Sequence, residues 1–397
     1  MNRSILFGLL LLCIGSSCGD NSFSSVTIPD YWIHYYGTDG DQTGIGLEKV
    51  SDGFVILGES KVQTNRHLFL SKTDDYGVEL WSSVYFEELD YDFEAIDISP
   101  TSDGGFVVSA TVFDGIQKDA FMMKVDASGA FLDSMYLGHP VYDDFAGDII
   151  EASDNSYILA GTSFDDDPEV MKNGMTAWRT LPNDISTLRP NDWNLIYSPG
   201  DLSYGIAVVE HNGEFYFSGT SNAYVSAELA GDNIVVYKLN ENGFPLHDSR
   251  FGTDQDNQNL CMKIYNQKLV VLGTTNNNGT QEVLIIEATT QNIQKISQLG
   301  FPSTRSIIPT SIAQIGGDYV ILGTEINTID DSNIYIGRVN AGQLLWERFF
   351  GDVSIDSGGK GVIGLPDGSA VFVGTIELGK QKKVMLCKID KNGDLNN

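Results

Sequence analysis

The chain has 397 residues, with 24 basic residues against 54 acidic ones and a formal net charge of −30 at pH 7. So acidic a surface repels nucleic acid and anionic lipid head groups, and we therefore expect no nucleic-acid partner. The cysteines form no Cys-x-x-Cys pair, which argues against a disulfide framework or a structural zinc site; they are Cys13, Cys18, Cys261 and Cys387.

The first residues, MNRSILFGLLLLCIGSSCGD, have the features of a secretory leader. One arginine precedes an apolar run at 5–14 that is too short to span a bilayer as a helix. The GSSC sequence at 15–18 resembles the lipobox of bacterial lipoproteins, in which the cysteine becomes the lipidated first residue of the mature chain. We therefore expect residues 1–17 to be a lipoprotein signal peptide, Cys18 to carry the lipid, and residues 18–29 to form a polar tether. Ordinary secretion and a retained anchor are the alternatives.

A strand-like run that ends in Gly-Thr or a close variant recurs seven times along the rest of the chain. The runs are GFVILGES (53–60), GFVVSAT (105–111), SYILAGT (156–162), EFYFSGT (214–220), KLVVLGT (268–274), DYVILGT (318–324) and SAVFVGT (369–375). The glycine of each run, which is an alanine in the second, follows the previous one by 50 to 58 residues. A period near 50 predicts one four-stranded sheet per unit.

Each run is expected to be the second strand, B, of its unit. A short aliphatic strand, A, precedes it across a tight turn such as Ser-Asp-Gly, and an alternating strand, C, follows it. A second turn of the Asp-x-x-Gly or Asn-x-x-Gly type leads into strand D, and the Gly and Asp residues suit the positive φ of tight hairpins. Strand D often carries a tryptophan four residues after the turn glycine, as in Gly77 and Trp81. We interpret Trp32, Trp81, Trp193 and Trp346 as packing residues of strand D.

The last unit supplies strands A, B and C, but the chain stops at Asn397, where its tryptophan is due. The missing strand resembles DYWIHYYG at 30–37. We therefore predict an all-β fold, a seven-bladed β-propeller of four-stranded antiparallel blades over residues 30–397. An N-terminal strand completes the last blade, because a closed ring leaves no exposed sheet edge.

The pattern Ser-Asp-Gly-Gly-Phe-Val-Val, followed by Lys-x-Asp-x-x-Gly-x-x-x-Trp, is similar to the tandem-repeat β-propellers of secreted and lipid-anchored proteins of Gram-negative bacteria. The resemblance covers residues 30–397 and implies a binding or scaffolding surface. The units lack the Ser-x-Asp-x-Gly-x-x-Trp box of sialidases and the quinone-ligating set of quinoproteins. We accordingly expect no cofactor.

Acidic residues stand near the start of strand A in most units; they are Asp41, Asp92, Asp144, Asp201, Asp256 and Asp356. Near the central axis they could form a ring of carboxylates that suits Ca²⁺. Alternatively, each caps the turn of its own blade by accepting backbone N–H groups. We favour caps, because the residue recurs in blades whose loops share no other liganding pattern, and we predict no metal site.

The longest step separates the third and fourth glycines and adds residues around 163–175 and 181–192. The next loop, 221–233, is also long. We predict that these loops form the binding patch, and its candidate residues are Phe164, Asp165, Asp166, Asp167 and Tyr224. A tolerated surface insertion is the alternative. The five histidines occupy unrelated positions, and we predict no catalytic residue.

Together these observations predict a non-catalytic lipoprotein anchored to the outer membrane, since Gly19, and not aspartate, follows the lipidated cysteine. Its partner is expected to be a protein of the cell envelope, and membrane contact is expected through the lipid alone. Two alternatives stay open: a glycan-binding lipoprotein for nutrient capture, and a hydrolase that uses a pair of carboxylates. Exposed aromatics beside acids favour a glycan, an exposed apolar patch favours a protein, and a pocket with convergent acids favours an enzyme.

Overall fold

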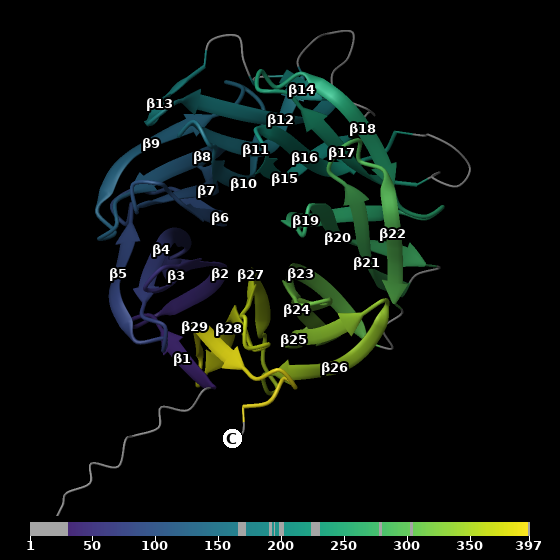
Figure 1. Ribbon diagram of the computed structural model, residues 1–397. Helices are drawn as coiled ribbons and strands as arrows, with labels where there is room; N and C mark the ends of the chain where they lie inside the picture. Colours follow the sequence, from purple (N-terminus) through teal and green to yellow (C-terminus); the bar gives the residue numbers. More distant parts are fainter. Residues whose placement is uncertain are drawn as a thin grey trace, which may run out of the picture.

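The computed structural model describes residues 31–165, 172–189, 193, 195–197, 202–223, 231–277, 280–301 and 305–395. In this part of the chain the strands form seven antiparallel sheets, which are arranged as the blades of a ring (Figure 1). The predicted all-β, seven-bladed propeller is therefore confirmed. Among the same residues, no helix is long and apolar enough to cross a membrane.

The first three blades follow one another along the chain. Blade 1 holds β2 (Asp41–Val50), β3 (Gly53–Val62), β4 (Asn65–Thr73) and β5 (Glu79–Tyr85). Blade 2 holds β6 (Asp92–Pro100), β7 (Phe106–Phe113), β8 (Lys118–Val125) and β9 (Phe131–Leu137). Blade 3 holds β10 (Phe145–Glu151), β11 (Tyr157–Asp165), β12 (Lys172–Leu181), β13 (Asp184–Leu188) and the short β14 (Leu195–Tyr197).

The other four blades complete the ring. Blade 4 holds β15 (Ser203–His211), β16 (Glu214–Ser221), β17 (Asn233–Leu239) and β18 (Pro245–Phe251). Blade 5 holds β19 (Asn257–Tyr265), β20 (Lys268–Asn277), β21 (Thr280–Thr289) and β22 (Lys295–Phe301). Blade 6 holds β23 (Ser306–Ile315), β24 (Asp318–Thr328), β25 (Asp331–Asn340) and β26 (Gln343–Phe350). Blade 7 holds β27 (Ser357–Gly364), β28 (Ala370–Leu378), β29 (Gln381–Ile389) and β1 (Trp32–Tyr36).

The N-terminal strand closes the ring as predicted. Strand β1 pairs with β29, so that Trp32 lies opposite Lys388 and Tyr36 opposite Val384. Tyr36 is buried, and its hydroxyl donates a hydrogen bond to the Gly77 carbonyl of blade 1 (2.5 Å). The first described strand of the chain is thus the rim strand of its last blade.

The structure of blade 3 explains the longest spacing between the recurring glycines of the sequence. Strand β14 pairs with the middle of β12, which is the place of strand D in the other blades. The residues between β12 and β14 include β13, which pairs with the end of β12 near Thr180. The added residues around 181–192 therefore give this blade a further rim strand.

The threonine of the recurring Gly-Thr links one blade to the next. In most junctions its Oγ1 atom accepts the backbone N–H of a strand-A residue in the following blade, at 2.9 to 3.1 Å; the pairs are Thr111 with Ala146, Thr162 with Gly205, Thr220 with Asn259, Thr324 with Gly358 and Thr375 with Gly44. Glu59 replaces the threonine in blade 1 and accepts the N–H of Ala95 (3.0 Å). These bonds satisfy buried backbone donors.

The tryptophan of strand D also acts between blades. Trp32 in β1 lies against Gly77, the turn glycine of blade 1, where a Cβ would come within 2.8 Å of the indole. Gly77 has φ +78°, so both its conformation and its contact favour glycine. Trp81, Trp193 and Trp346 lie in the same way against Gly129, Gly243 and Gly393 of the following blades. These contacts show that the tryptophans are packing residues; Trp32, Trp81 and Trp346 belong to the rim strands β1, β5 and β26, whereas Trp193 precedes β14 and is not part of a strand.

Candidate functional site

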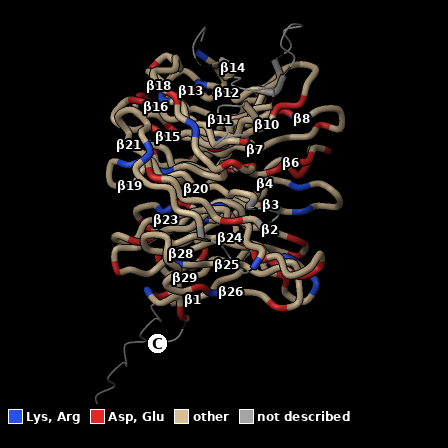
Figure 2. Tube along the Cα trace, turned by 90° about the vertical axis from the view of Figure 1, so that its right-hand side faces the viewer, with Lys and Arg blue, Asp and Glu red and all other residues tan. Residues whose placement is uncertain are grey.

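The ring has two faces of different construction. The A–B and C–D turns lie on one side, which we call the turn face, and the B–C and D–A connections lie on the other, which we call the loop face. In the side view of Figure 2, acidic residues are spread between fewer basic ones. The distribution of charge therefore does not show which face carries a binding site. The contacts of the side chains on each face are needed to decide this.

On the turn face, many of the charged side chains form ion pairs with one another. Each blade pairs one strand-C side chain with one residue at its A–B turn; the pairs are Lys72–Asp52, Lys124–Asp103, Arg179–Asp154, Lys238–Glu214, Arg338–Asp318, Lys388–Asp367 and, with the charges exchanged, Glu287–Lys268. The lysine of the recurring Lys-x-Asp sequence is thus a structural residue. Ion pairs at a surface contribute little stability one by one.

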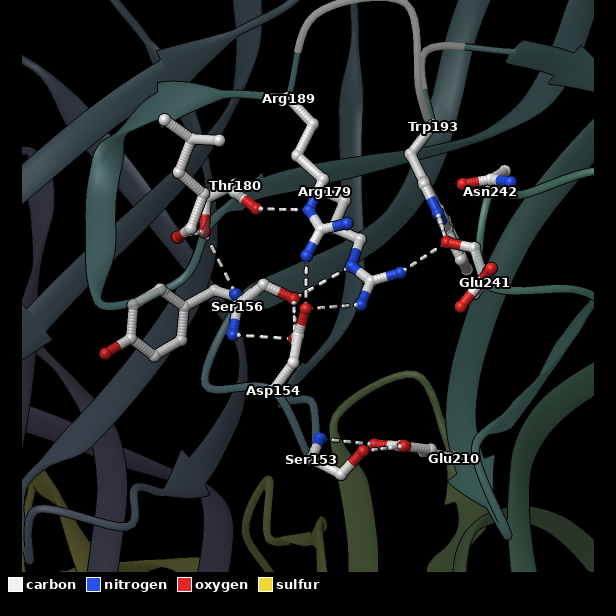
Figure 3. Close-up of polar contacts among 12 residues, drawn as sticks. Ser153, Asp154, Ser156, Arg179, Thr180, Arg189, Trp193, Glu210, Glu241 and Asn242 are labelled. Carbon is white, nitrogen blue, oxygen red and sulfur yellow. Dashed lines mark hydrogen bonds and ion pairs between the residues drawn. The ribbon is translucent and has the colours of Figure 1, made fainter.

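The most elaborate of these pairs lies between blades 3 and 4. In Figure 3 the carboxylate of Asp154 lies between the guanidinium groups of Arg179 and Arg189. Arg179 is buried, donates to the Glu241 carbonyl of blade 4 (2.7 Å) and lies over the ring of Phe215. Burial alone would raise the pKa of Asp154, but hydrogen bonds from Ser156 and the positive charge of Arg179 lower it to about 2. This network is saturated by protein groups, and we assign it to structure.

The acids at the start of strand A accept backbone hydrogen bonds. The bonds run to Asp41 from Lys382, to Asp92 from Arg66, to Asp144 from His139, to Asp256 from Asp232 and to Asp356 from Glu377. For Asp41, Asp92 and Asp256 the donor belongs to the preceding blade, so these acids tie blades together and do not cap their own turns. Asp201 lies outside the described residues. In the described part of the chain, no group of three or more His, Cys, Asp or Glu side chains could hold a metal ion.

Only part of the predicted binding patch falls within the structure. Asp166, Asp167 and Tyr224 lie outside the described residues, and of Asp165 only the backbone is described, at the end of β11. The ring of Phe164 is half-buried and lies 4.1 Å from the ring of Tyr142, which comes from the D–A connection before blade 3. The patch itself stays a prediction.

A different part of the loop face exposes apolar side chains. Among the described residues, the most exposed large hydrophobic side chains are Ile329 (92%) and Val353 (89%), followed by Ile116 and Val141. All four stand on the loop face. Ile355, two residues after Val353, and Leu378, at the end of β28, are also exposed. We call Ile329, Val353, Ile355 and Leu378 the blade 6–7 patch.

Asp356 holds the loops of this patch together. Its buried carboxylate accepts the backbone N–H of Glu377 (2.7 Å) and the hydroxyl of Ser354 (2.9 Å). Its own N–H donates to the Ser332 carbonyl (3.0 Å), and the Ser332 N–H donates to Ser354 (2.9 Å). Three loops, from blades 6 and 7 and from the connection between them, therefore present the patch on a fixed support. Loop length did not reveal it, but aliphatic residues inside the short acidic loops NTIDD and GDVSID were a usable signal.

The central channel is the second candidate site. A cavity of about 240 Å³ at its turn-face end is lined by the charged residues Glu48, Asp97, Lys263 and Lys360. Burial raises the pKa of Glu48 to about 7. Sequence reasoning did not select these residues, since no motif distinguishes them from the other residues of β2, β6, β19 and β27.

Comparison with known proteins supports the fold but no more specific assignment. No family model matches the chain, and neither does any curated protein. Among solved structures, the chain is similar to a phage phi92 endosialidase at 10% identity and a TM-score of 0.52, over 91% of this chain and 69% of that one. It is also similar to a puromycin hydrolase (S511A mutant complexed with PGG) at 10% identity and a TM-score of 0.54, over 88% and 52% of the two chains.

A third similar structure is a prolyl endopeptidase, at 11% identity and a TM-score of 0.52, over 89% of this chain and 47% of that one. The chain therefore spans about half the length of the puromycin hydrolase and endopeptidase chains. At such low identity the likeness shows the propeller fold alone.

Proposed function

We propose that the protein is a non-catalytic binding module of the cell envelope, held to the outer membrane through Cys18, and that its loop face binds another protein. The blade 6–7 patch is the observation that carries this proposal. Exposed aliphatic side chains on a rigid support are typical of protein-binding surfaces, because burying them on binding is favourable and little loop ordering is required.

The direction of the anchor supports the same surface. Trp32 begins β1 opposite Lys388, near the end of β29, so the chain enters blade 7 from the turn-face side. A lipid on Cys18 would hold that side toward the membrane. The loop face would then point away from the membrane, toward a partner.

Site-specific photo-crosslinking in intact cells tests the partner. A photoreactive residue at 329 or 353 is expected to give one dominant crosslinked protein. The matched positions are 80 and 345, whose leucines are exposed at the starts of rim strands β5 and β26 near the turn face. We expect no such product there. The same product from all four positions, or none from 329 and 353, would contradict the proposal.

The anchor has a separate test. Cys18→Ser is expected to release a folded protein into the soluble fraction and to abolish incorporation of a radioactive fatty acid. Incorporation that survives this substitution would show that the lipid is attached elsewhere or that the leader is not a lipoprotein signal.

A carboxylate-dependent hydrolase is the second candidate, because Glu48 and Asp97 converge on one cavity. A raised pKa of about 7 suits a general acid at neutral pH. Release of reducing sugar or amine from oligosaccharide and peptide libraries, abolished by Glu48→Gln, would favour this candidate over the binding module.

A further inference from the structure

The innermost strand of each blade lies next to the axis of the ring (Figure 1), and each of these strands is interrupted by a β-bulge near its middle. A bulge bends the strand and redirects a side chain. Asp148 and Lys360 are among the unpaired residues of the bulges in β10 and β27, and Asp97 directly follows the bulge of β6. The fold therefore directs charged groups toward the axis at one level of the ring.

Glu48 and Lys263 stand two residues farther along β2 and β19, nearer the turn face. The charges of the whole cluster are separated by sign. Glu48, Asp97 and Asp148 come from blades 1, 2 and 3, whereas Lys263 and Lys360 come from blades 5 and 7. All but Asp148 line the cavity of about 240 Å³, together with Tyr265 and Gln314. Asp148 is close enough for its carboxylate to feel the charges of both lysines. The cavity thus has an acidic side and a basic side, with room for a molecule of amino-acid size.

The position of Lys360 is built into the glycine-rich strand β27. A Cβ on Gly359 would lie 2.7 Å from the Ile45 carbonyl oxygen, and one on Gly361 would lie 2.3 Å from the Leu47 Cβ. Only glycines allow β27 to approach β2 this closely. The lysine between them is therefore held at the channel by the packing of blade 7 against blade 1.

The five charged groups have few protein partners. Asp97 accepts the backbone N–H of Ile149 (3.1 Å). Among the residues that the structure describes, Glu48, Asp148, Lys263 and Lys360 make no hydrogen bond or direct ion pair through their charged groups. Glu48, Asp97, Asp148 and Lys263 are half-buried, and Lys360 is exposed. Charged groups that lose water are costly unless they are paired, so a ligand in this cavity is favoured when it brings charges of the opposite sign.

We propose that this cavity binds a small zwitterion with one excess positive charge, of the chemical class of the cationic α-amino acids. Its cationic nitrogens would face the carboxylates of Glu48 and Asp97, and its carboxylate would face Lys263 and Lys360. A simple anion would meet the acids, and a simple cation would meet two ammonium groups. A molecule that carries both signs matches both sides, and Asp148, a third ionisable acid near the lysines but outside the lining, accounts for the excess positive charge.

Isothermal titration calorimetry on the full chain tests this with three probes. L-Arginine has both signs, agmatine lacks the carboxylate, and succinate lacks the cations. We expect L-arginine to bind, agmatine to bind at least tenfold more weakly, and succinate not to bind. Equal affinities for L-arginine and agmatine, or no heat of binding with any probe, would overturn the proposal.

Substitutions locate the site. Lys360→Met and Glu48→Gln are each expected to weaken L-arginine binding at least tenfold, whereas Lys61→Met, an exposed lysine on the loop face, should leave it unchanged. Thermal unfolding checks that each variant is folded. If Lys360→Met fails to fold, Glu48→Gln decides alone. Retained L-arginine binding in a folded Glu48→Gln variant would refute the site. Ile329→Asp, which changes the loop face, should not affect L-arginine binding, and so it separates this proposal from the loop-face proposal.

The pH dependence gives an independent readout. The titratable groups around the cavity are Glu48, Asp97, Asp148, Cys261, Lys263, Tyr265 and Lys360. Burial raises the pKa of Glu48 to about 7 and also raises the pKa of Asp148. Burial raises the pKa values of Cys261 and Tyr265 to about 12, so both stay neutral. Affinity for L-arginine should therefore rise from pH 6 to pH 8 with proton release, and an affinity that falls over this range would contradict the proposal.

Discussion

The junction of blades 7 and 1 and the junction of blades 5 and 6 use the same register positions with different chemistry. Between blades 7 and 1, the N–H of Gly44 donates to Thr375 (3.0 Å), and Trp32 lies against Gly77. Between blades 5 and 6, Pro309 stands at the position of Gly44 and has no N–H to donate. Thr274, at the position of Thr375, instead accepts the side-chain amide of Gln281 (3.1 Å).

The other two links differ as well. Ser297 stands opposite Glu287, at the register position of the tryptophan, and Leu299, two residues farther along β22, lies 3.5 Å from a Cβ built on Gly342. Glu287 takes the place of the strand-C cation and accepts the hydroxyl of Tyr319 in blade 6 (2.7 Å). The junction of blades 5 and 6 therefore retains the packing of the ring but not the residues that recur elsewhere.

Chain connectivity explains why one junction tolerates these replacements. Glu287 and Tyr319 are 32 residues apart, whereas Gly44 and Thr375 are 331 residues apart. Bringing distant residues together costs more chain entropy than bringing near ones together. No short stretch of chain joins blades 7 and 1, so the contacts between their side chains have to offset the larger entropy cost of closure. Removing links should therefore cost more at the closing junction.

The largest effect is expected from the closing strand itself. Deleting residues 19–38 removes β1, and with it Trp32 and the buried Tyr36. Loss of a buried aromatic side chain alone typically costs about 3–5 kcal/mol. Deleting residues 19–28 leaves β1 in place and should barely change the free energy of unfolding. Urea unfolding of the two truncations makes the comparison, and equal midpoints would show that β1 does not stabilise the ring.

A smaller effect is expected from the recurring threonine. Thr375→Val leaves the N–H of Gly44 buried without an acceptor, which should lower the free energy of unfolding by about 1–3 kcal/mol. Thr274→Val is the matched control, because Pro309 provides no N–H at that junction. It should cost less than about 1 kcal/mol. A cost at Thr274 that equals the cost at Thr375 would mean that the methyl and hydroxyl packing, and not the link between blades, explains the recurrence.

The blade count and the closing strand could be predicted from sequence because both depend on spacing. The seven Gly-Thr runs and the detached DYWIHYYG require no knowledge of contacts. The role of the threonine could not be predicted, since Thr111 meets Ala146 only when neighbouring blades pack. The reason for the recurring residues therefore lies between the units, where a single sequence shows nothing.

The candidate sites were harder to predict from the sequence than the fold, for two physical reasons. Loop length pointed to Phe164 and its neighbours, whereas the exposed aliphatic residues Ile329 and Val353 stand in short loops fixed by a buried Asp356. In the channel, the bulges interrupt the two-residue alternation of strand A. Alternation therefore does not predict that Asp97 and Lys360 belong to one level of the ring.

The smallest effect is expected at the junction of blades 5 and 6, and it depends on pH. Burial alone would raise the pKa of Glu287, but hydrogen bonds from Tyr319, Lys268 and Ser297 hold it below the ordinary value of 4.5. The contribution of this ionised carboxylate is present above that value and is lost as the pH falls through the lowered pKa. Tyr319→Phe removes one donor and should cost about 0.5–1.5 kcal/mol at pH 7, and less at pH 3.

Tyr76→Phe, in an exposed turn of blade 1, is the control and should cost little at either pH. Urea unfolding of both variants and the parent at pH 7 and pH 3 measures the difference. Because Tyr319 and Glu287 replace the recurring links at this junction, a cost for Tyr319→Phe that is independent of pH would show that the phenol contributes by packing. In that case blades 5 and 6 would be joined mainly by apolar contact, and the contrast with the closing junction would be stronger.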